Sequence, residues 1–488
     1  MAGAARQSPV YRAGFALAGP YGVHGAHVLV VLAVLVTAAF LLALRRACPD
    51  GDSAPGVRDR VALAAAGLFL VFSTTWHDYD ALAANCELFL LVPQSAAAWL
   101  LMRALTGAAT WRGPRRLAAH LAVGILIGLS ALFKVQGLTF LGASLGLLGW
   151  WALLGRLSWG GAGVGALAHL AGAAVPSALY LAWCARAGNL DAAVTWFRFN
   201  FSYVGAGLTG TEALLRGLRR TALIGGTALV PYALGMAAAV ATAVGLAHTV
   251  RHHRRRESIT EPPFEPPSPV AVLGLLWLVT SAIAVSAGGR FFGHYFHLVL
   301  PPLCLLAAPS AARLAAMPRR RLLLGALVAL PALSFFALAT VARPLTVMLD
   351  EHTPPYAEVA ARITALTTPD ERLFVWGNSP QLYVLAQRPM GTRFSFCNYI
   401  TGESPGTPTE TGQRNADANR LAASWDMLFA DLNTRRPTLF VDAAAAGWDG
   451  YDKYPLARYP ALRTYVERHY AVAERVSNVV IYRRTRAD

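Results

Sequence analysis

A short polar stretch separates two apolar runs in this sequence, and its residue types are suited to binding an anion. Residues 288–296 read Gly-Gly-Arg-Phe-Phe-Gly-His-Tyr-Phe. Arg290 can hold two phosphate oxygens with its planar guanidinium, unless it forms a purely structural ion pair. His294 and Tyr295 can donate further hydrogen bonds, although an interfacial aromatic belt also explains a tyrosine there. Because a cation inside a membrane is costly without an anion, the stretch predicts a docking place for a phosphate-bearing lipid.

Four charged residues in other loops could serve the same chemistry. Lys134 interrupts an apolar region, so its ammonium could bind a phosphate oxygen or simply reach the membrane interface. Glu87, at a predicted helix start, could bind a sugar hydroxyl, orient a cation, or merely favour the helix dipole. Asp78 and Asp80 could take a proton from an acceptor hydroxyl or hold a divalent ion; equally, they could cap the next helix. The simplest expectation is that no cofactor is required, with a divalent metal as the alternative.

The elements that carry these residues are predicted membrane spans. The chain has 488 residues, of which 55% are hydrophobic and only 14% charged. Runs of about 20 apolar residues are long enough to cross a bilayer. We expect ten spans, at about 23–44, 61–76, 88–105, 118–133, 136–154, 161–185, 221–249, 270–287, 296–317 and 322–343. The fold class is therefore a polytopic α-helical membrane protein.

The charge distribution predicts how these spans are oriented. The formal net charge is +16, and the whole excess lies in residues 1–343, where 27 basic residues face 11 acids. Under strict alternation the arginine-rich loops all fall on one side, which the positive-inside rule makes cytoplasmic. These clusters are topology signals, so no nucleic-acid partner is expected. The opposite loops carry every candidate residue. Five cysteines without paired or metal-ligand spacing indicate neither a disulfide framework nor a zinc site.

Four segments are expected outside the spans of the membrane domain at 23–343. Residues 1–22 form an external N-terminal remnant, 186–220 an amphipathic external segment, and 257–269 a proline-rich cytoplasmic linker. Residues 344–488 carry 16 basic and 16 acidic side chains and alternate β-rich with helical runs, which predicts a small extracytoplasmic α/β domain. Its predicted strands are 372–376, 438–441 and 478–482, and its predicted helices are 379–386, 415–433 and 459–470.

Four motifs in this order resemble bacterial membrane glycosyltransferases of family 39 type, which belong to the GT-C superfamily. The motifs are Asn85-Cys-Glu-Leu-Phe89, Gly128-Leu-Ser-Ala-Leu-Phe-Lys134, Gly289-Arg-Phe-Phe-Gly-His-Tyr295 before Pro301-Pro302, and Phe374-Val-Trp-Gly-Asn-Ser-Pro-Gln-Leu-Tyr383. The resemblance covers nearly the whole chain. It implies a multi-pass protein of the bacterial cytoplasmic (inner) membrane that uses a polyprenyl-phosphate-linked sugar donor. The acceptor would be a glycan, lipid or protein on the outer face, and inversion is expected.

The same resemblance implies a catalytic acid in the first external loop, after a first helix. The sequence begins just downstream of that loop, so we expect 11 or more spans in the full family and suspect a late start at Met1. Asp78 and Asp80 then remain as catalytic candidates. One alternative is a non-catalytic relative that binds polyprenyl phosphate or assists a partner enzyme. A transporter is a weaker alternative, because we find no internal repeat.

Overall fold

The computed structural model describes most of the chain, and the described residues divide into two compact units. It describes residues 13, 16–19, 24–48, 54–75, 83–107, 113–205, 210–255, 266–342, 354–403 and 420–485. The helical unit comprises Val30–Leu190 and Leu208–Leu345. The C-terminal unit comprises Met1–Leu29, Asp191–Gly207 and Thr346–Asp488.

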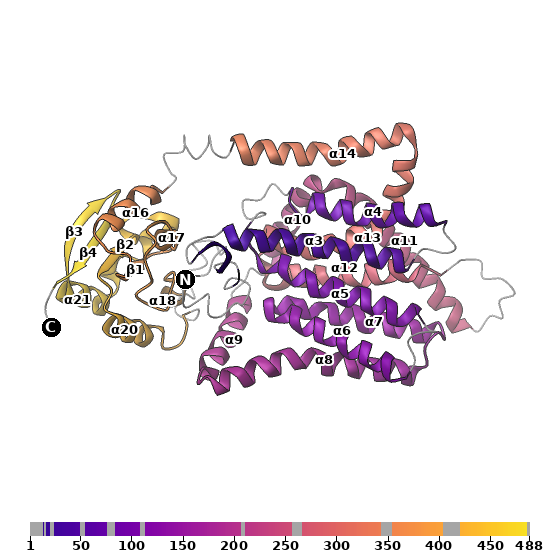
Figure 1. The fold of residues 1–488 in the computed structure, drawn as a ribbon, viewed down its shortest axis with the longest axis horizontal. Coiled ribbons are helices and arrows are strands. Elements are labelled where there is room, and N and C mark those ends of the chain that lie inside the picture. The colour runs from indigo at the N-terminus through magenta and orange to yellow at the C-terminus, as the bar shows by residue number, and fades with distance from the viewer. Residues whose placement is uncertain are drawn as a thin grey trace. The chain divides into compact units, whose positions relative to one another are not determined.

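Apolar helices make up the helical unit (Figure 1). They are α3 (His24–Ala47, whose residues up to Leu29 are assigned to the C-terminal unit), α4 (Pro55–Phe72), α5 (Cys86–Thr106), α6 (Pro114–Phe133), α7 (Thr139–Leu153), α8 (Trp159–Arg186), α10 (Gly210–Thr227), α11 (Leu229–Arg255), α12 (Pro269–Ser286), α13 (Leu300–Ala316) and α14 (Pro318–Ala337). Each of the ten predicted spans overlaps a helix. Among the described residues, eight helices are long and apolar enough to cross a membrane, and α4 and α7 are not among them. The polytopic α-helical fold is confirmed; the count of ten spans is not established.

One predicted span is broken in the structure. The sequence predicts a single span over 221–249, but α10 ends at Thr227 and α11 begins at Leu229. Pro231 lies in the first turn of α11, where its missing N–H costs no helical hydrogen bond. The first part of the predicted span therefore belongs to the amphipathic helix α10. The predicted amphipathic segment 186–220 accordingly forms two helices, α9 (Leu190–Gly205) and α10.

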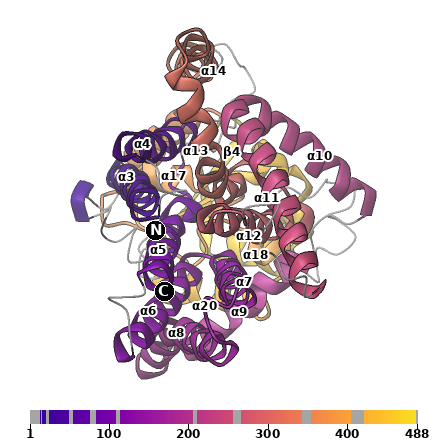
Figure 2. The ribbon, with the colours of Figure 1, turned by 90° about the vertical axis from the view of Figure 1, so that its right-hand side faces the viewer.

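Close backbone packing joins α6 to α8, and α5 lies against α6 (Figure 2). A Cβ atom built on Gly124 would lie 2.3 Å from the carbonyl oxygen of His169, and one on Gly172 would lie 2.3 Å from that of Leu121. Small residues allow helices to approach in this way inside a membrane. The His120 and His169 rings meet in the same interface, with Nδ1 and Nε2 3.1 Å apart. This packing fixes α6, the helix that ends at the candidate residue Lys134.

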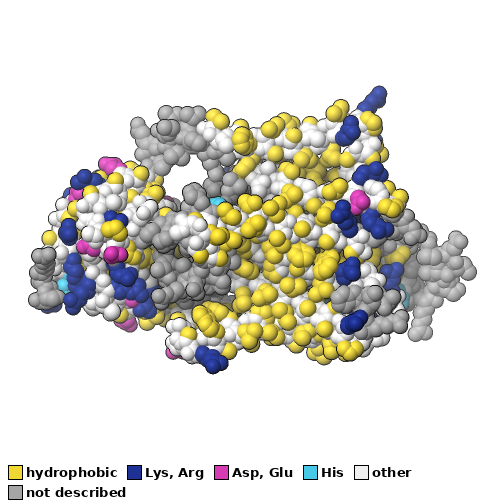
Figure 3. Space-filling view, in the orientation of Figure 1, with side chains coloured by type: hydrophobic (Ala, Val, Ile, Leu, Met, Phe, Trp, Pro, Cys, Tyr) yellow, Lys and Arg dark blue, Asp and Glu magenta, His cyan; other side chains and the backbone are white. Residues whose placement is uncertain are grey.

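The surface of the helical unit separates apolar from basic side chains. Hydrophobic side chains cover its flank in Figure 3, and lysine and arginine side chains gather at its right-hand end. Arginines lie at helix ends, such as Arg46 in the last turn of α3, whose Nε donates to Asp59 of α4 at 2.9 Å. An apolar flank with charge at its end is the surface expected of a membrane-embedded bundle.

A four-stranded sheet with helices on both faces forms the C-terminal unit. The strands are β1 (Leu373–Trp376), β2 (Leu439–Asp442), β3 (Tyr470–Val476) and β4 (Val479–Arg484), in the order β1-β2-β4-β3. β1 and β2 are parallel, and the other pairs are antiparallel. The helices are α16 (Tyr356–Ala365), α17 (Gln381–Leu385), α18 (Asn398–Thr401), α20 (Ser424–Arg435) and α21 (Pro460–His469). The small sheet-containing domain is therefore confirmed.

Side-chain alternation along β1 builds the two cores of this unit. Phe374 and Trp376 face a core that includes residues of α20 and α21, whereas Leu373 and Val375 face residues of α16 and α17. Trp376 donates through Nε1 to the carbonyl of Tyr454 at 3.0 Å, and neither its ring nor its neighbours reach the surface. The motif around Trp376 therefore forms the core of the unit.

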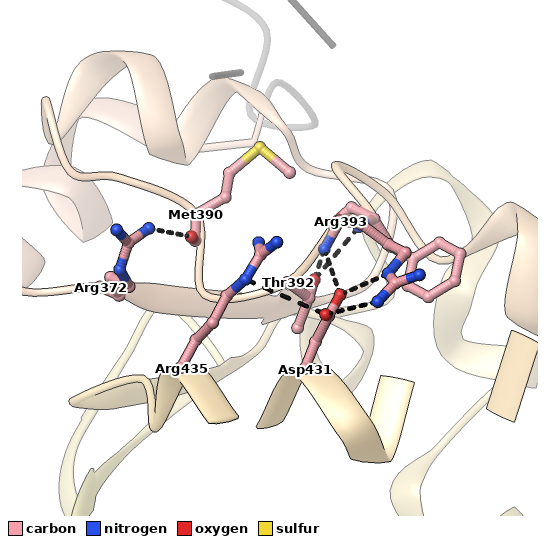
Figure 4. Close-up of polar contacts among 7 residues, drawn as sticks. Arg372, Met390, Thr392, Arg393, Asp431 and Arg435 are labelled. Carbon is pink, nitrogen blue, oxygen red and sulfur yellow. Dashed lines mark hydrogen bonds and ion pairs between the residues drawn. The ribbon is translucent and has the colours of Figure 1, made fainter. Parts of the chain in front are cut away.

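An ion pair fastens the loop after α17 to α20 (Figure 4). The Arg393 guanidinium donates through Nε and Nη2 to the two carboxylate oxygens of Asp431 at 2.8 and 2.9 Å, and the Arg393 backbone N–H donates at 2.7 Å. Burial alone would raise the pKa of Asp431, but these Arg393 donors and the charge of Arg435 outweigh it and lower the pKa. The bidentate geometry makes this a structural contact that stabilises the unit.

Candidate functional site

Lys134 is held at the end of α6 by several packing constraints. The helix ends at Phe133, and Lys134 adopts an extended conformation before a short 3₁₀ turn. Gly137 in that turn lies against Ser130, where an added Cβ would come within 2.5 Å of the backbone. Gln94 of α5 donates to the Gly137 carbonyl at 3.2 Å. These contacts fix the backbone from which the Lys134 side chain projects.

Glu87 lies in the first turn of α5 and forms a direct ion pair with Lys134. Its side chain is only 2% exposed, whereas that of Lys134 is 25% exposed. Glu87 thus lies between the Lys134 ammonium and the N-terminal end of α5, the positive end of the helix dipole. The structure therefore brings together two residues that the sequence places 47 positions apart.

Residues 288–296 form a strained loop that reaches the Glu87–Lys134 pair. Gly288 and Gly289 have φ values of +77° and +63°, and Phe291, which is not a glycine, has a φ of +47°. Strain at a non-glycine residue persists only where the surroundings hold it. The Phe291 ring rests on Gly217 of α10, where an added Cβ would lie 2.7 Å from the ring. α10 therefore supports the loop that carries Arg290 and His294.

His294 and Tyr295 complete the cluster around Glu87. Nε2 of His294 lies 3.9 Å from Oε1 of Glu87. The Lys134 ammonium lies 4.0 Å from the centre of the Tyr295 ring, a cation–π contact. The rings of His294 and Tyr295 meet edge to face, with centroids 4.8 Å apart. We call Glu87, Lys134, His294 and Tyr295 the Glu87 cluster.

Arg290 lies on the same loop as the cluster and is buried. Its side chain belongs to a residue that is 3% exposed, and it is engaged within the protein. An arginine is buried at such cost only with compensating partners. The Arg290 guanidinium is therefore held in place by contacts within the protein. The predicted phosphate would have to meet it in that position.

Two predicted catalytic candidates, Asp78 and Asp80, lie outside the described residues. Among the residues that the structure does describe, no group of three or more His, Cys, Asp or Glu side chains could hold a metal ion. The described cluster contains one carboxylate, and that carboxylate is buried against a lysine. Glu87 is therefore suited to holding Lys134 and His294 in place rather than to taking a proton from an acceptor.

Sequence reasoning missed one residue beside the cluster. His297 follows His294 by three positions and is fully buried. Its ring nitrogens lie 3.0 Å from the carbonyl oxygens of His294 and of Ser73 at the end of α4. A second histidine one turn after a predicted site histidine was the available signal. The sequence could not show that α4 ends beside it.

The arrangement is chemically suited to an anionic head group next to a membrane. It places a partly exposed ammonium, an imidazole and a phenol side by side, with a buried guanidinium on the same loop. Fixed cations of this kind stabilise negative charge that develops on a leaving phosphate. Glu87 neutralises part of this charge and orients it.

One solved membrane-protein structure has a similar fold over nearly the whole chain. A crystal structure of ArnT from Cupriavidus metallidurans, bound to undecaprenyl phosphate, matches with a TM-score of 0.52. The match covers 97% of this chain and 86% of that one, at 16% identity. At that identity the likeness establishes the fold alone.

Other comparisons are more distant. The archaeal oligosaccharyltransferase AglB from Archaeoglobus fulgidus, in complex with an inhibitory peptide and a dolichol-phosphate, matches with a TM-score of 0.43 at 14% identity. The match covers 97% of this chain but only 63% of AglB, and it carries no argument here. No protein-family model matches the chain. No curated protein matches it in sequence.

Proposed function

We propose that this protein is a membrane glycosyltransferase that transfers a sugar from a polyprenyl-phosphate-linked donor to a glycan, lipid or protein acceptor. The observation that carries the proposal is that Glu87, Lys134 and the pair His294 and Tyr295 come together from three separate segments of the helical unit: Glu87 contacts Lys134 and His294, and Lys134 contacts the Tyr295 ring. That the ArnT structure of the same fold was solved with undecaprenyl phosphate supports this choice of donor.

The Glu87 cluster and Arg290 together supply the donor-phosphate contacts in this proposal. Arg290 and Lys134 bind the phosphate oxygens, and His294 and Tyr295 donate further hydrogen bonds. Glu87 holds the lysine and the histidine at the spacing that the phosphate requires. The partial exposure of Lys134 leaves its remaining N–H donors accessible to a ligand, because one ammonium carries three.

The reaction is a single displacement at the anomeric carbon. The acceptor oxygen forms a bond to that carbon while the bond to the phosphate oxygen breaks, and the electron pair leaves on the polyprenyl phosphate. A carboxylate takes the acceptor proton, and Asp78 and Asp80 are the candidates for this role. Attack from the face opposite the leaving group inverts the configuration. The fixed cations stabilise the negative charge on the leaving phosphate.

The proposal also specifies a location. The arginine-rich end of the helical unit faces the cytoplasm, under the positive-inside rule, so the Glu87 cluster faces the outer side of a bacterial cytoplasmic membrane. In this orientation, a lipid-linked sugar made on the cytoplasmic side must cross to the outer leaflet before the protein uses it. Cysteine-accessibility labelling of intact cells at the two ends of the helical unit tests this orientation.

The function is tested with purified protein in nanodiscs. Synthetic undecaprenyl-phosphate hexoses and pentoses serve as donors, a membrane extract serves as the acceptor source, and mass spectrometry measures released undecaprenyl phosphate. We expect release with at least one donor and its loss in Arg290→Ala. Arg319→Ala, which changes an exposed arginine in the first turn of α14, is the matched control and should retain activity.

Two results would change the proposal. Binding of undecaprenyl phosphate without release from any donor would identify a non-catalytic protein that holds the lipid. Equal release by the wild type and Arg290→Ala would contradict the assigned phosphate site while leaving the activity itself intact.

A further inference from the structure

Helix α10 belongs to the helical unit but does not run parallel to its spans. It carries one acid, Glu212, and three arginines, Arg216, Arg219 and Arg220. It is not among the described helices that are long and apolar enough to cross a membrane. In Figure 2, α12 and α14 are seen nearly end-on, whereas α10 runs across the view. The direction of α10 is therefore that of a helix lying on a bilayer surface rather than spanning it.

The three faces of α10 differ in chemistry. Gly217 and Ile224 are seven residues apart, share one face and are buried. Leu214, Leu215 and Leu218 share a second face and are 61%, 61% and 60% exposed. The three arginines lie on a third face, beside the leucines. An exposed leucine face next to an arginine face is the pattern of a helix that lies in the membrane interface.

The buried face of α10 supports the loop at residues 288–296, which we call the donor loop. The ring of Phe291 rests on Gly217, where an added Cβ would lie 2.7 Å from it. The two 3₁₀ turns of the region, Ala287–Gly289 and Gly293–Val299, also pack against α10. A force that fixes α10 on the membrane would therefore also fix the loop that carries proposed phosphate ligands.

We propose that α10 docks on an anionic bilayer surface and thereby holds the donor loop in place. The leucine face enters the acyl region, and the arginine face contacts lipid phosphates. Arg219 is exposed, whereas Arg216 and Arg220 also have contacts within the protein. Three arginines against one acid favour anionic over zwitterionic lipids. The docking does not depend on the activity, but its effect on donor binding rests on the proposed function.

Spin labels at two exposed leucines of α10 test the docking. Leu218→Cys places a label on the leucine face, and Leu223→Cys places one between Arg216 and Arg219 around the helix. In phosphatidylglycerol nanodiscs, the label at position 218 should collide more often with oxygen, which concentrates in the acyl region. The label at position 223 should collide more often with a water-soluble nickel chelate. Wild-type protein gives the background from the five native cysteines.

Two spin-label results would overturn the docking. Equal access of the nickel chelate to both labels would place α10 in water. Protection of both labels from both reagents would mean that protein, and not lipid, covers the leucine face.

The lipid dependence of donor turnover tests the coupling to the donor loop. One arginine at an anionic surface changes an equilibrium by about fivefold. Arg219→Gln should therefore raise the donor KM by up to about fivefold in phosphatidylglycerol nanodiscs and leave it unchanged in phosphatidylcholine nanodiscs. Arg319→Gln in α14 is the matched control and should leave the KM unchanged in both lipids.

The outcomes separate the coupling from the proposed function. Equal KM values for Arg219→Gln and the wild type in phosphatidylglycerol would overturn the coupling. Absence of turnover with any donor would instead overturn the proposed function, and the spin labels would still decide the docking.

Discussion

Substitutions in the Glu87–Lys134 ion pair can distinguish its contribution to stability from the role of Lys134 in donor binding. The Glu87 side chain is 2% exposed and that of Lys134 is 25% exposed, so the two single substitutions have unequal costs. Lys134→Met leaves a buried carboxylate with His294 3.9 Å away, and should lower the free energy of unfolding by about 3 kcal/mol. Glu87→Gln leaves an ammonium that can turn toward water, and should cost about 1 kcal/mol.

The double variant Glu87→Gln, Lys134→Met should recover part of the lost stability. Because no charge is then left without its partner, its cost should fall about 1–2 kcal/mol short of the sum of the single costs. Unfolding titrations in mixed micelles, followed by tryptophan fluorescence, measure all three variants. Donor affinity, measured in parallel, should not recover, because Lys134 is absent.

Two results would refute this reasoning. Additive stability costs would mean that the ion pair contributes nothing measurable. Donor affinity restored together with stability in the double variant would mean that Lys134 acts only through folding and does not bind phosphate.

Three further perturbations test other parts of the account. Arg290→Ala should lower kcat for donor turnover by about 100-fold while leaving membrane insertion unchanged, because it removes charge that stabilises the leaving phosphate; unchanged kcat would exclude that role. Gly217→Ala should raise the donor KM, because the added methyl group would displace the Phe291 ring, whereas Gly226→Ala, with open space around it, should not; equal KM values would contradict this support. Burial raises the pKa of Asp442 to about 6 from 3.8, so its charged form weakens the fold as pH rises through this range. Asp442→Asn should therefore stabilise the C-terminal unit by up to about 3 kcal/mol at pH 7 and by nothing near pH 3, measured by hydrogen exchange of β2; equal gains at both pH values would contradict this.

Much of the fold could be predicted because hydropathy reports directly on membrane helices. Every predicted span overlaps a helix, since runs of apolar residues have few alternatives in a bilayer. The break at Ala228 was missed because the apolar run continues through it and Pro231 is tolerated inside membrane helices. Strand β3 was missed because it is an edge strand whose residues are mostly exposed, so the sequence lacks an apolar run there.

Less of the candidate site could be predicted, because tertiary contacts create it. Loop topology places Glu87, Lys134 and His294 at the same end of the helical unit. Only the packing of α5 against α6 makes Glu87 the partner of Lys134. The contact of His297 with Ser73 joins segments more than 200 positions apart and leaves no local signal in either. Sequence patterns thus identified the residue types of the site but not their pairing.

Donor-phosphate binding at the Glu87 cluster is tested most directly by a cryo-EM structure of the protein in nanodiscs with undecaprenyl phosphate. The account predicts phosphate density within hydrogen-bond distance of the Lys134 ammonium and the Arg290 guanidinium, with the Glu87–Lys134 pair intact. Phosphate density at another place, with the cluster unchanged, would contradict it.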